Sequence, residues 1–406
     1  MLATAGVIVR PFRLPEAVWA VGGAAALVCL GLLPVGLAWL GVGKGLDVYL
    51  FLTGMMLLAE VARATGLFDW LASVAAAHAR GSATRLFRLI YVVGIVVTVF
   101  LSNDATAVVL TPAVAAITRA CKVANPLPYL FICALIANAA SFVLPISNPA
   151  NLVIYGSQMP PLAQWIPLFG VPSLVAIAVT YLILRWTQRH ALVQSIVAEV
   201  RVPQLSVAAK AAAWGIGLAA LLLTVASALG WQLGLPTCVA GIVTLVGVTA
   251  LRRSSPWPLL REISWGIIPL VAGLFVLVEA LDQSGVIRAL SDAMRAGAQE
   301  SVAFTAAGSG LLVGFLSNLV NNLPAGLMAG SAVQAAHVPA DISSAILIGV
   351  DLGPNLSVTG SLATILWLTA LRRERVQVAG VSFLKLGLLV MPPALILSLG
   401  ALILLH

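Results

Sequence analysis

Apolar runs long enough to cross a lipid bilayer recur along the whole chain. One helical crossing needs about 20 apolar residues, and hydrophobic residues make up 61% of the 406 residues, with charged residues at 9%. Soluble globular domains hold about 25% charged residues, so we expect an all-α polytopic membrane protein. The runs, which predict about 9–10 spans, lie near residues 18–40, 46–66, 127–155, 163–186, 210–229, 236–251, 263–282, 341–371 and 380–405.

Two further apolar regions, 86–118 and 301–336, each consist of two short arms around a polar tip. The tips read FLSNDATAVVLTP (100–112) and FLSNLVNNLPAG (315–326). Each arm is shorter than a full crossing, and amide groups without partners are costly at membrane depth. We therefore expect two re-entrant helical hairpins whose tips face protein, water or a ligand.

The chain contains an internal repeat at an offset of about 219 residues. The stretch 52–70 matches 271–289, and the tips pair Asp104 with Asn322 at nearly the same offset. Three identical pairs carry the longer match: Gly54 and Gly273, Glu60 and Glu279, and Gly66 and Gly285. Because an odd number of spans separates the matching elements, the two units have opposite orientations. Inverted repeats of this kind are typical of secondary transporters.

The repeat predicts the organisation of the chain. We expect a first repeat at 1–186, a cytoplasmic linker at 187–209 and a second repeat at 210–406. The first holds the hairpin 86–118 and a broken helix at 127–155, and the second holds the hairpin 301–336 and a broken helix at 341–371. Residues 1–9 resemble the end of a helix that corresponds to 210–229. We expect either a shortened N-terminal helix or a start codon placed too late.

The two broken helices carry the polar motifs ISNPANLVIYG (146–156) and DLGPNLSVTGSLATILW (351–367). Their prolines and glycines free backbone groups, and their side chains supply donors and acceptors. With the tips they predict a polar cavity near the membrane midplane. The alternative is that these groups only satisfy one another, but four motifs related by inverted symmetry favour a binding site. The candidate substrate-binding residues are Asn103, Ser147, Asn148, Asn151, Asn318, Asn321, Asn322, Asn355, Thr359, Ser361 and Thr364.

Asp104 and Asp351 are the acidic residues that lie at membrane depth, where such a residue costs about 2.5–3.5 kcal/mol on insertion scales. A carboxyl group screened from water can exchange protons near neutral pH, as proton antiport requires. We expect both to be proton-coupling candidates, and the alternative is that each caps a helix end. Glu60 and Glu279 lie near span ends, with Arg63 one turn from Glu60, so a salt bridge or a snorkelling carboxylate is expected there.

Other kinds of chemistry have weaker signals. Cys29, Cys121, Cys133 and Cys238 stand singly and are expected to be packing residues. Cys121 and Cys133 are the alternative thiol ligands for a soft metalloid. The histidines are scattered, so we expect no metal site and no cofactor. No GxxxxGK[ST] motif and no nucleophile–base constellation occurs, and we therefore expect neither ATP hydrolysis nor another enzymatic activity in this chain.

The distribution of basic residues predicts the orientation in the membrane. The net charge of +8 forms no single patch, so no nucleic-acid partner is expected. With the N-terminus in the cytoplasm, 19 of the 22 basic residues fall on cytoplasmic segments, and Lys44, Arg288 and Arg295 fall outside. This assignment requires the first hairpin to enter from the cytoplasm and the second from outside. We expect a multi-pass protein of the bacterial inner membrane.

Three motifs resemble those of a known family. SNDATAVVLTPAV (102–114), NNLPAGLMAG (321–330) and above all IGVDLGPNLSVTGSLATILWL (348–368) resemble the bacterial arsenite/antimonite efflux permeases, the membrane subunits of arsenical pumps, within the ion transporter superfamily. The resemblance covers nearly the whole chain. It implies export of trivalent arsenite and antimonite, as neutral trihydroxides, by proton antiport. It also implies an optional cytosolic ATPase partner.

The tips depart from one branch of this superfamily. Sodium–dicarboxylate relatives carry Ser-Asn-Thr there, whereas this chain reads Ser102-Asn103-Asp104 and Val320-Asn321-Asn322. The departure argues against a carboxylate substrate and against sodium coupling. A ring of amide and hydroxyl groups suits a small neutral trihydroxide, which needs no countercharge. The alternatives are a sodium/proton antiporter or inorganic-anion transporter on the same scaffold, and a channel-like permease that relies on an ATPase.

Overall fold

The computed structural model describes residues 16–197 and 200–405. Within these residues every regular element is helical, apart from one isolated bridge between Ser82 and Ser195. The expected all-α fold is confirmed. The expectations for residues 1–9 and for the cytoplasmic N-terminus concern residues outside the described part of the chain.

Among the described residues, 6 helices are long and apolar enough to cross a membrane, or up to 8 spans if each of two bent helix pairs counts as one. The 6 are α6 (Ala83–Phe100), α11 (Leu162–Thr187), α12 (Val207–Ala228), α13 (Gly234–Arg252), α17 (Val302–Val320) and α21 (Gly380–Leu405). The bent pairs are α3 (Val35–Lys44) with α4 (Leu46–Ala64), and α15 (Ile267–Gln283) with α16 (Val286–Glu300). Other expected spans are built from shorter helices.

The expected single span at 18–40 is instead two helices. α2 covers Glu16–Cys29, and the chain then turns before α3 begins at Val35. Gly31 takes a φ of +70°, which favours glycine, and Pro34 stands at the N-cap of α3. The left-handed Gly31 ends α2, because the Leu32 and Leu33 N–H groups turn back to the Leu27 carbonyl, and α3 begins after Pro34.

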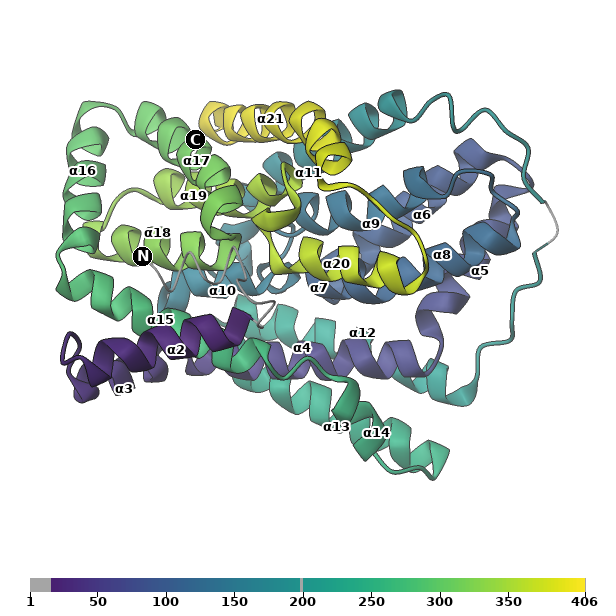
Figure 1. The fold of residues 1–406 in the computed structure, drawn as a ribbon, viewed down its shortest axis with the longest axis horizontal. Helices are drawn as coiled ribbons and strands as arrows, with labels where there is room; N and C mark the ends of the chain where they lie inside the picture. The colour runs from purple at the N-terminus through teal and green to yellow at the C-terminus, as the bar shows by residue number, and fades with distance from the viewer. Residues whose placement is uncertain (1–15, 198–199, 406) are drawn as a thin grey trace.

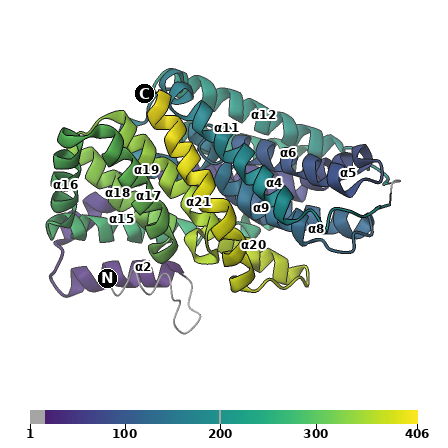
Figure 2. The same cartoon turned by 90° about the horizontal axis from the view of Figure 1, so that it is seen from above.

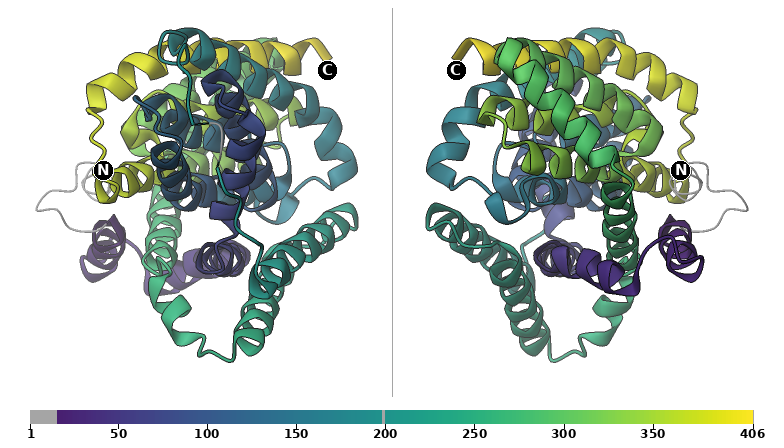
Figure 3. Two further views of the ribbon diagram at one scale, coloured as in Figure 1. Left: turned by 90° about the vertical axis from the view of Figure 1, so that its right-hand side faces the viewer. Right: turned by 90° about the vertical axis from the view of Figure 1, so that its left-hand side faces the viewer.

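Two packed bodies make up the molecule (Figures 1 and 3). The scaffold body contains α2, α3, α4, α12, α13, α14 (Trp257–Glu262) and α15, and it lies along the lower part of Figure 1. In it α4 packs along α13, and α2 packs along α15. A Cβ at Gly54 would lie 2.2 Å from the Thr237 carbonyl oxygen, so the α4–α13 contact depends on glycine.

The hairpin body contains the remaining helices. In the first half these are α5 (Leu67–Ala79), α6, α7 (Asn103–Ala105), α8 (Thr111–Ala120), α9 (Leu127–Ala139), α10 (Pro149–Tyr155) and α11. In the second half they are α16, α17, α18 (Asn322–Ala336), α19 (Ala340–Leu352), α20 (Leu362–Arg373) and α21. α21 packs on α11, α19 and α17, on the side that faces away from the scaffold body (Figure 2).

Both halves follow the same order of elements, as the internal repeat predicted. α4 leads to α5, a hairpin, a broken helix and α11, and α15 leads to α16, a hairpin, a broken helix and α21. The paired glycines Gly66 and Gly285 precede α5 and α16, with φ values of +77° and +82°. A left-handed residue at this corner lets the chain leave the scaffold body, which explains a glycine at both positions.

The two hairpins enter the molecule from opposite ends. In Figure 1, α6 and α8 reach the centre from the right, and α17 and α18 reach it from the left. The broken helices α9–α10 and α19–α20 pass beside the two tips. The linker after α11 donates from the Ile196 N–H to the Gly81 carbonyl and from the Val197 N–H to the Cys121 carbonyl, so it is tied to the base of the first hairpin.

Candidate substrate-binding site

A small cavity lies where the two hairpin tips meet the two broken helices. Its volume is about 20 Å³, roughly the space of one water molecule. Each hairpin and each broken helix contributes lining residues, and Leu52 and Ile267 of the scaffold body cover it. The lining residues are Leu52, Asn103, Asp104, Asn148, Pro149, Ile267, Asn322, Leu323, Ser361, Leu362 and Ala363.

Four helices begin at this cavity, and a side chain caps each of them. Ser102 Oγ accepts from the Ala105 N–H at 3.2 Å, and Asn321 Oδ1 accepts from the Leu323 N–H at 3.4 Å. On the broken helices, Asn148 Oδ1 accepts from the Ala150 N–H at 3.0 Å and Ser361 Oγ from the Thr364 N–H at 3.1 Å. Short polar side chains are favoured at these positions because they satisfy first-turn N–H groups.

Both tips depart from regular helix geometry. Asn321 takes φ +70° and ψ 152°, a region that residues other than glycine rarely occupy and that costs about 1–3 kcal/mol. In the first hairpin the turn after Asp104 is a π-helix, Thr106–Leu110, and Pro112 follows it. Proline cannot donate to the preceding turn, which accounts for the wider helix there. The backbone at both tips is thus held in place by the packing around it.

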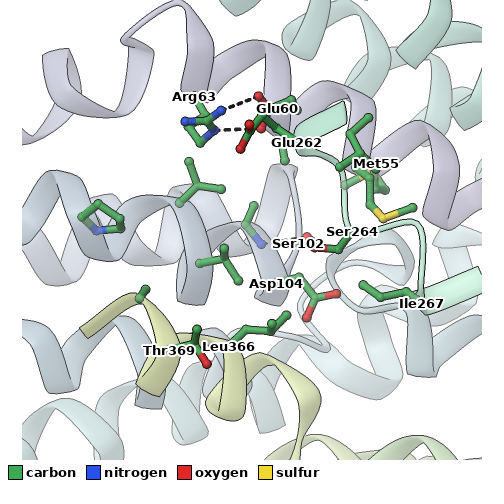
Figure 4. Close-up of a pocket in the computed structure, with 18 of the residues that line it drawn as sticks. Met55, Glu60, Arg63, Ser102, Asp104, Glu262, Ser264, Ile267, Leu366 and Thr369 are labelled. Carbon is green, nitrogen blue, oxygen red and sulfur yellow. Dashed lines mark hydrogen bonds and ion pairs between the residues drawn. The ribbon is translucent and has the colours of Figure 1, made fainter. Parts of the chain in front are cut away.

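A second, larger cavity of about 440 Å³ adjoins the small one (Figure 4). We call it the vestibule. It lies between the scaffold body and the helices α8 and α20, and its wall includes Glu60, Arg63, Glu262, Thr369 and Arg373. Four residues line both cavities: Leu52, Asp104, Pro149 and Ile267. The vestibule therefore leads to the small cavity at Asp104.

The Asp104 carboxylate forms no hydrogen bond or ion pair with other side chains among the described residues. Its backbone N–H donates to Asn103 Oδ1 at 2.9 Å, and among the described residues no hydrogen bond or ion pair engages its carboxylate oxygens. The side chain is partly exposed and faces the vestibule (Figure 4). The alternative role as a helix cap falls to Ser102 instead.

The expected salt bridge of Glu60 is confirmed. Arg63 donates to both Glu60 oxygens, at 2.6 and 2.8 Å, on the wall of the vestibule. Glu279, its counterpart in the second repeat, accepts from Lys44 Nζ at 2.6 Å. Each glutamate thus has a cationic partner, although one partner comes from the same helix and the other from α3.

Five of the predicted polar residues line the small cavity, and the others bond inside the protein. Asn103, Asp104, Asn148, Asn322 and Ser361 line it. Asn318 donates to the Gly314 and Gly353 carbonyls and accepts from Ser357, and so ties the second tip to the broken helix. The remaining substrate-binding candidates bond to backbone or to each other: Ser147 to Val99, Asn151 to Ser141, Asn321 to Thr359, Asn355 to Leu135, Thr359 to Asn318, and Thr364 to Ser361.

Asp351 lies behind the cavity, at the contact between the repeats. Its Oδ1 accepts from Asn148 Nδ2 at 2.7 Å. Beside it, Asn138 Nδ2 donates to Asn355 Oδ1 at 3.0 Å. Sequence reasoning missed Asn138 because it is a single amide in the apolar part of the span 127–155. The signal that could have found Asn138 is its equivalence to Asp351 in the repeat. Each is the next-to-last residue of a helix of 13 residues.

The cysteines lie away from this site. Cys121 and Cys133 are buried and line neither cavity, and Cys133 Sγ approaches the Tyr129 carbonyl at 3.9 Å. Among the described residues, no group of three or more His, Cys, Asp or Glu side chains is arranged to hold a metal ion.

Comparisons with known proteins place the chain among transporters. Its relatives include the "Arsenical pump membrane protein" of Escherichia coli (strain K12), 27% identical over 349 residues, with 83% of this chain and 81% of that protein covered. The "Putative arsenical pump membrane protein" of Bacillus subtilis (strain 168) is 25% identical over 425 residues, covering 97% of this chain and 95% of that protein. The resemblance expected from the motifs is confirmed.

A solved structure shares the fold. The crystal structure of the Alcanivorax borkumensis YdaH transporter, described as having an unusual topology, matches with a TM-score of 0.57 and 15% identity, over 96% of each chain. A family model described as CitMHS, citrate transporter, matches residues 4–352, which include both hairpins and most of both repeats. This chain therefore belongs to the CitMHS family of multi-pass membrane transporters.

Proposed function

We propose that this chain is a secondary active transporter of the bacterial inner membrane that exports trivalent arsenite and antimonite, as neutral trihydroxides, by proton antiport. The observation that carries the proposal is the small cavity. Amide side chains, one hydroxyl and a single carboxylate line it, and they come from both repeats. The names of the curated relatives point to arsenical substrates. In this proposal Asn103, Asn148, Asn322 and Ser361 bind the substrate.

The chemistry of the lining suits an uncharged polyol-like solute. Amide and hydroxyl groups donate to and accept from three hydroxyls without supplying a charge. No lysine or arginine lines the small cavity, whereas Arg63 and Arg373 line the vestibule. A carboxylate substrate would lie beside Asp104 with no cation to offset the repulsion. The site therefore favours a neutral substrate over an anion.

Proton coupling is assigned to Asp104. The membrane voltage supplies no energy for moving a neutral solute. Export against the concentration gradient of the solute therefore needs a coupled proton. Asp104 lines both cavities. The ionised carboxylate accepts a hydrogen bond from a substrate hydroxyl, and the protonated one gives up that contact. Substrate and proton thus compete for one residue, which is the requirement for antiport.

Alternating access in this proposal comes from movement of the hairpin body against the scaffold body. The vestibule lies between the two bodies, and the distribution of basic residues assigns its open end to the cytoplasm. In this proposal the structure corresponds to a cytoplasm-facing state. A cytosolic arsenical-pump ATPase is an optional partner, because the proposed cycle is complete with the proton gradient alone.

Purified protein in proteoliposomes tests the proposal. With an imposed pH gradient and no ATP, we expect accumulation of arsenite in the wild type and loss of accumulation in Asp104→Asn. Asp292→Asn, at an exposed position on α16, is the matched control and keeps full activity. Proton-driven uptake that is unchanged in Asp104→Asn would remove this residue from coupling.

The family description favours one alternative, a citrate-like carboxylate substrate. The other alternative is the sodium/proton antiporter or inorganic-anion transporter named in the sequence analysis. The same proteoliposomes distinguish both. Transport of citrate, or sodium-dependent transport that ignores arsenite, would replace the proposed substrate. A requirement for an added ATPase would instead indicate a channel-like permease.

A further inference from the structure

The scaffold body has a small apolar cluster of its own, separate from the main core. It joins the C-terminal ends of α4 and α13 and the N-terminal end of α12 to the short helix α14, which follows α13 (Figure 1). From α14 the cluster takes Leu259 and Ile263, which are four residues apart and share one helix face. Its buried members are Leu57, Val61, Ala212, Leu245, Val248, Leu259 and Ile263. One face of α14 is thus fixed to this end of the scaffold body.

The other face of α14 is exposed and carries a tryptophan and an arginine. Trp257 is 57% exposed, and the guanidinium carbon of Arg261 lies 5.3 Å from the centre of its ring. Trp265, just after the helix, is 41% exposed. Trp257 and Arg261 are also four residues apart, so the short helix has an apolar face and a face of aromatic and basic side chains.

Three more basic side chains lie at this end of the scaffold body, and all are exposed. Arg252 ends α13, Arg253 follows it as the C-cap, and Lys210 lies in the first turn of α12. Arg252 donates to the Ala64 carbonyl at 3.3 Å. Among the described residues, the side chains of Lys210, Arg253 and Arg261 form no ion pair and no hydrogen bond. Their charges are therefore available to a ligand.

The acidic residues of the same four helices lie elsewhere. α12 and α13 contain none. On α4, Asp47 accepts from the Gly234 N–H at the far end of α13, and Glu60 pairs with Arg63. On α14, Glu262 lines the vestibule, beside the Glu60 pair (Figure 4). No carboxylate of these helices offsets the charge on the exposed face.

Exposed arginines beside exposed tryptophans match the headgroup region of a membrane. Arginine binds phosphate through two parallel N–H donors, and basic segments next to a spanning helix are attracted to acidic lipids. The indole ring is favoured at the boundary between headgroups and acyl chains. α13 is long and apolar enough to span and ends at Arg252, so Trp257 follows a membrane crossing by five residues. This position favours a lipid surface over an acidic protein.

We propose that this end of the scaffold body binds the phosphate headgroups of acidic phospholipids in the cytoplasmic leaflet. In this proposal Lys210, Arg253 and Arg261 contact the phosphates, and Trp257 and Trp265 lie at the boundary with the acyl chains. The cytoplasmic leaflet is the one that the distribution of basic residues assigns to this end of the protein.

The lipid-binding surface and the vestibule share α14. Glu262 and the two residues after it, Ile263 and Ser264, line the vestibule. Headgroups bound on the outer face of α14 hold the scaffold wall of the vestibule at the membrane surface, and the hairpin body is left to move. This consequence rests on the alternating access proposed above, whereas the lipid binding does not.

Thermal unfolding of the purified full-length protein in a neutral detergent tests the binding. We expect phosphatidylglycerol to raise the unfolding temperature of the wild type, and phosphatidylcholine at the same concentration to leave it unchanged. Arg253→Gln/Arg261→Gln should need about tenfold more phosphatidylglycerol for the same rise, since each basic side chain adds to the attraction. Without lipid this variant should unfold close to the wild-type temperature, because both side chains are exposed.

Arg85→Gln/Arg88→Gln is the matched control. Both arginines are exposed on α6 in the hairpin body, and the sequence assigns them to the same side of the membrane. The control loses the same charge and should keep the wild-type response to phosphatidylglycerol. An equal loss of response in the two double variants would show that total charge alone attracts the lipid, and would overturn the proposal. If Arg253→Gln/Arg261→Gln does not fold, Lys210→Gln/Arg261→Gln takes its place with the same expectation.

Three other results also overturn the proposal. The first is a wild type that does not respond to phosphatidylglycerol. The second is an equal response to soluble glycerol phosphate, which would indicate a site for free phosphate. The third is stabilisation by polyglutamate and not by phosphatidylglycerol, which would indicate an acidic protein partner. None of these measurements uses arsenite, so a protein that binds phosphatidylglycerol but does not transport arsenite keeps this inference and loses the proposed function.

Discussion

Asn103 and Asn322 line one cavity although they belong to hairpins that enter the molecule from opposite ends. Asn103 follows the capping residue Ser102, and Asn322 follows the capping residue Asn321. The two capping residues are 219 residues apart, which is also the offset between the matching stretches 52–70 and 271–289. The structure therefore pairs Asn103 with Asn322 and shifts the sequence pairing of Asp104 with Asn322 by one residue. Asp104 corresponds to Leu323, so the carboxylate has an apolar counterpart.

Removing the Asn322 amide should weaken substrate binding without weakening the fold. Its side chain lines the cavity and makes no hydrogen bond within the described residues. A neutral hydrogen bond contributes about 0.5–1.5 kcal/mol, so Asn322→Ala should raise the KM for arsenite by about two- to tenfold. Asn318→Ala is the comparison, because Asn318 bonds only to protein. It should lower the unfolding temperature, and equal effects of the two substitutions on KM would contradict the assignment.

A cysteine introduced on the wall of the vestibule should react from one side of the membrane. Thr369 is exposed and lines the vestibule, whereas Ala345 is fully buried in α19. In a cysteine-free background, Thr369→Cys should react with a membrane-impermeant maleimide in inside-out vesicles and not in right-side-out vesicles. Ala345→Cys should not react in either. Labelling of Thr369→Cys only from the periplasmic side would reverse the assigned orientation.

The contact between α17 and α19 should not tolerate a methyl group. A Cβ at Gly349 would lie 2.2 Å from the Gly310 carbonyl oxygen, and backbone would have to move. We expect Gly349→Ala to destabilise the protein by about 1–3 kcal/mol, as overpacking does, and to lower the thermal unfolding temperature. Gly308→Ala on α17, where nothing lies within 4 Å, should leave that temperature unchanged or slightly raised. Equal temperatures for the two variants would refute the close packing.

Arsenite transport should not need the thiols. Cys121 and Cys133 line neither cavity. Burial raises the pKa of the Cys121 thiol above its ordinary value, so less of it is the thiolate that binds a soft metalloid at neutral pH. The double variant Cys121→Ala/Cys133→Ala should keep the wild-type KM for arsenite in proteoliposomes. A large rise in KM, with unchanged unfolding temperature, would restore the thiol-ligand hypothesis.

Much of the architecture was predictable from local sequence. Long apolar runs have few ways to satisfy their backbone in a membrane except as helices, and a glycine such as Gly66 turns the chain at the end of a helix. The hairpins followed from the polar tips, and the repeat followed from matched residues such as Glu60 and Glu279. The expected arm length was wrong for α6 (18 residues) and α17 (19 residues), which are each long and apolar enough to cross a membrane. The split of the span at 18–40 was missed, because hydropathy alone does not register a turn between two apolar helices.

By itself the sequence determined the fold class, the inverted repeats and the set of polar residues at membrane depth, because each depends on composition and spacing along one stretch of chain. Only the tertiary structure decided which of these polar residues face a cavity. Asn103 and Asn322 face it, whereas Asn318 and Asn355 bond to protein, and Asp351 lies behind Asn148. The physical reason is that an amide side chain can hydrogen-bond equally well to a ligand or to the backbone groups that are left free where a helix is interrupted. The choice depends on neighbours that lie hundreds of residues away in the chain.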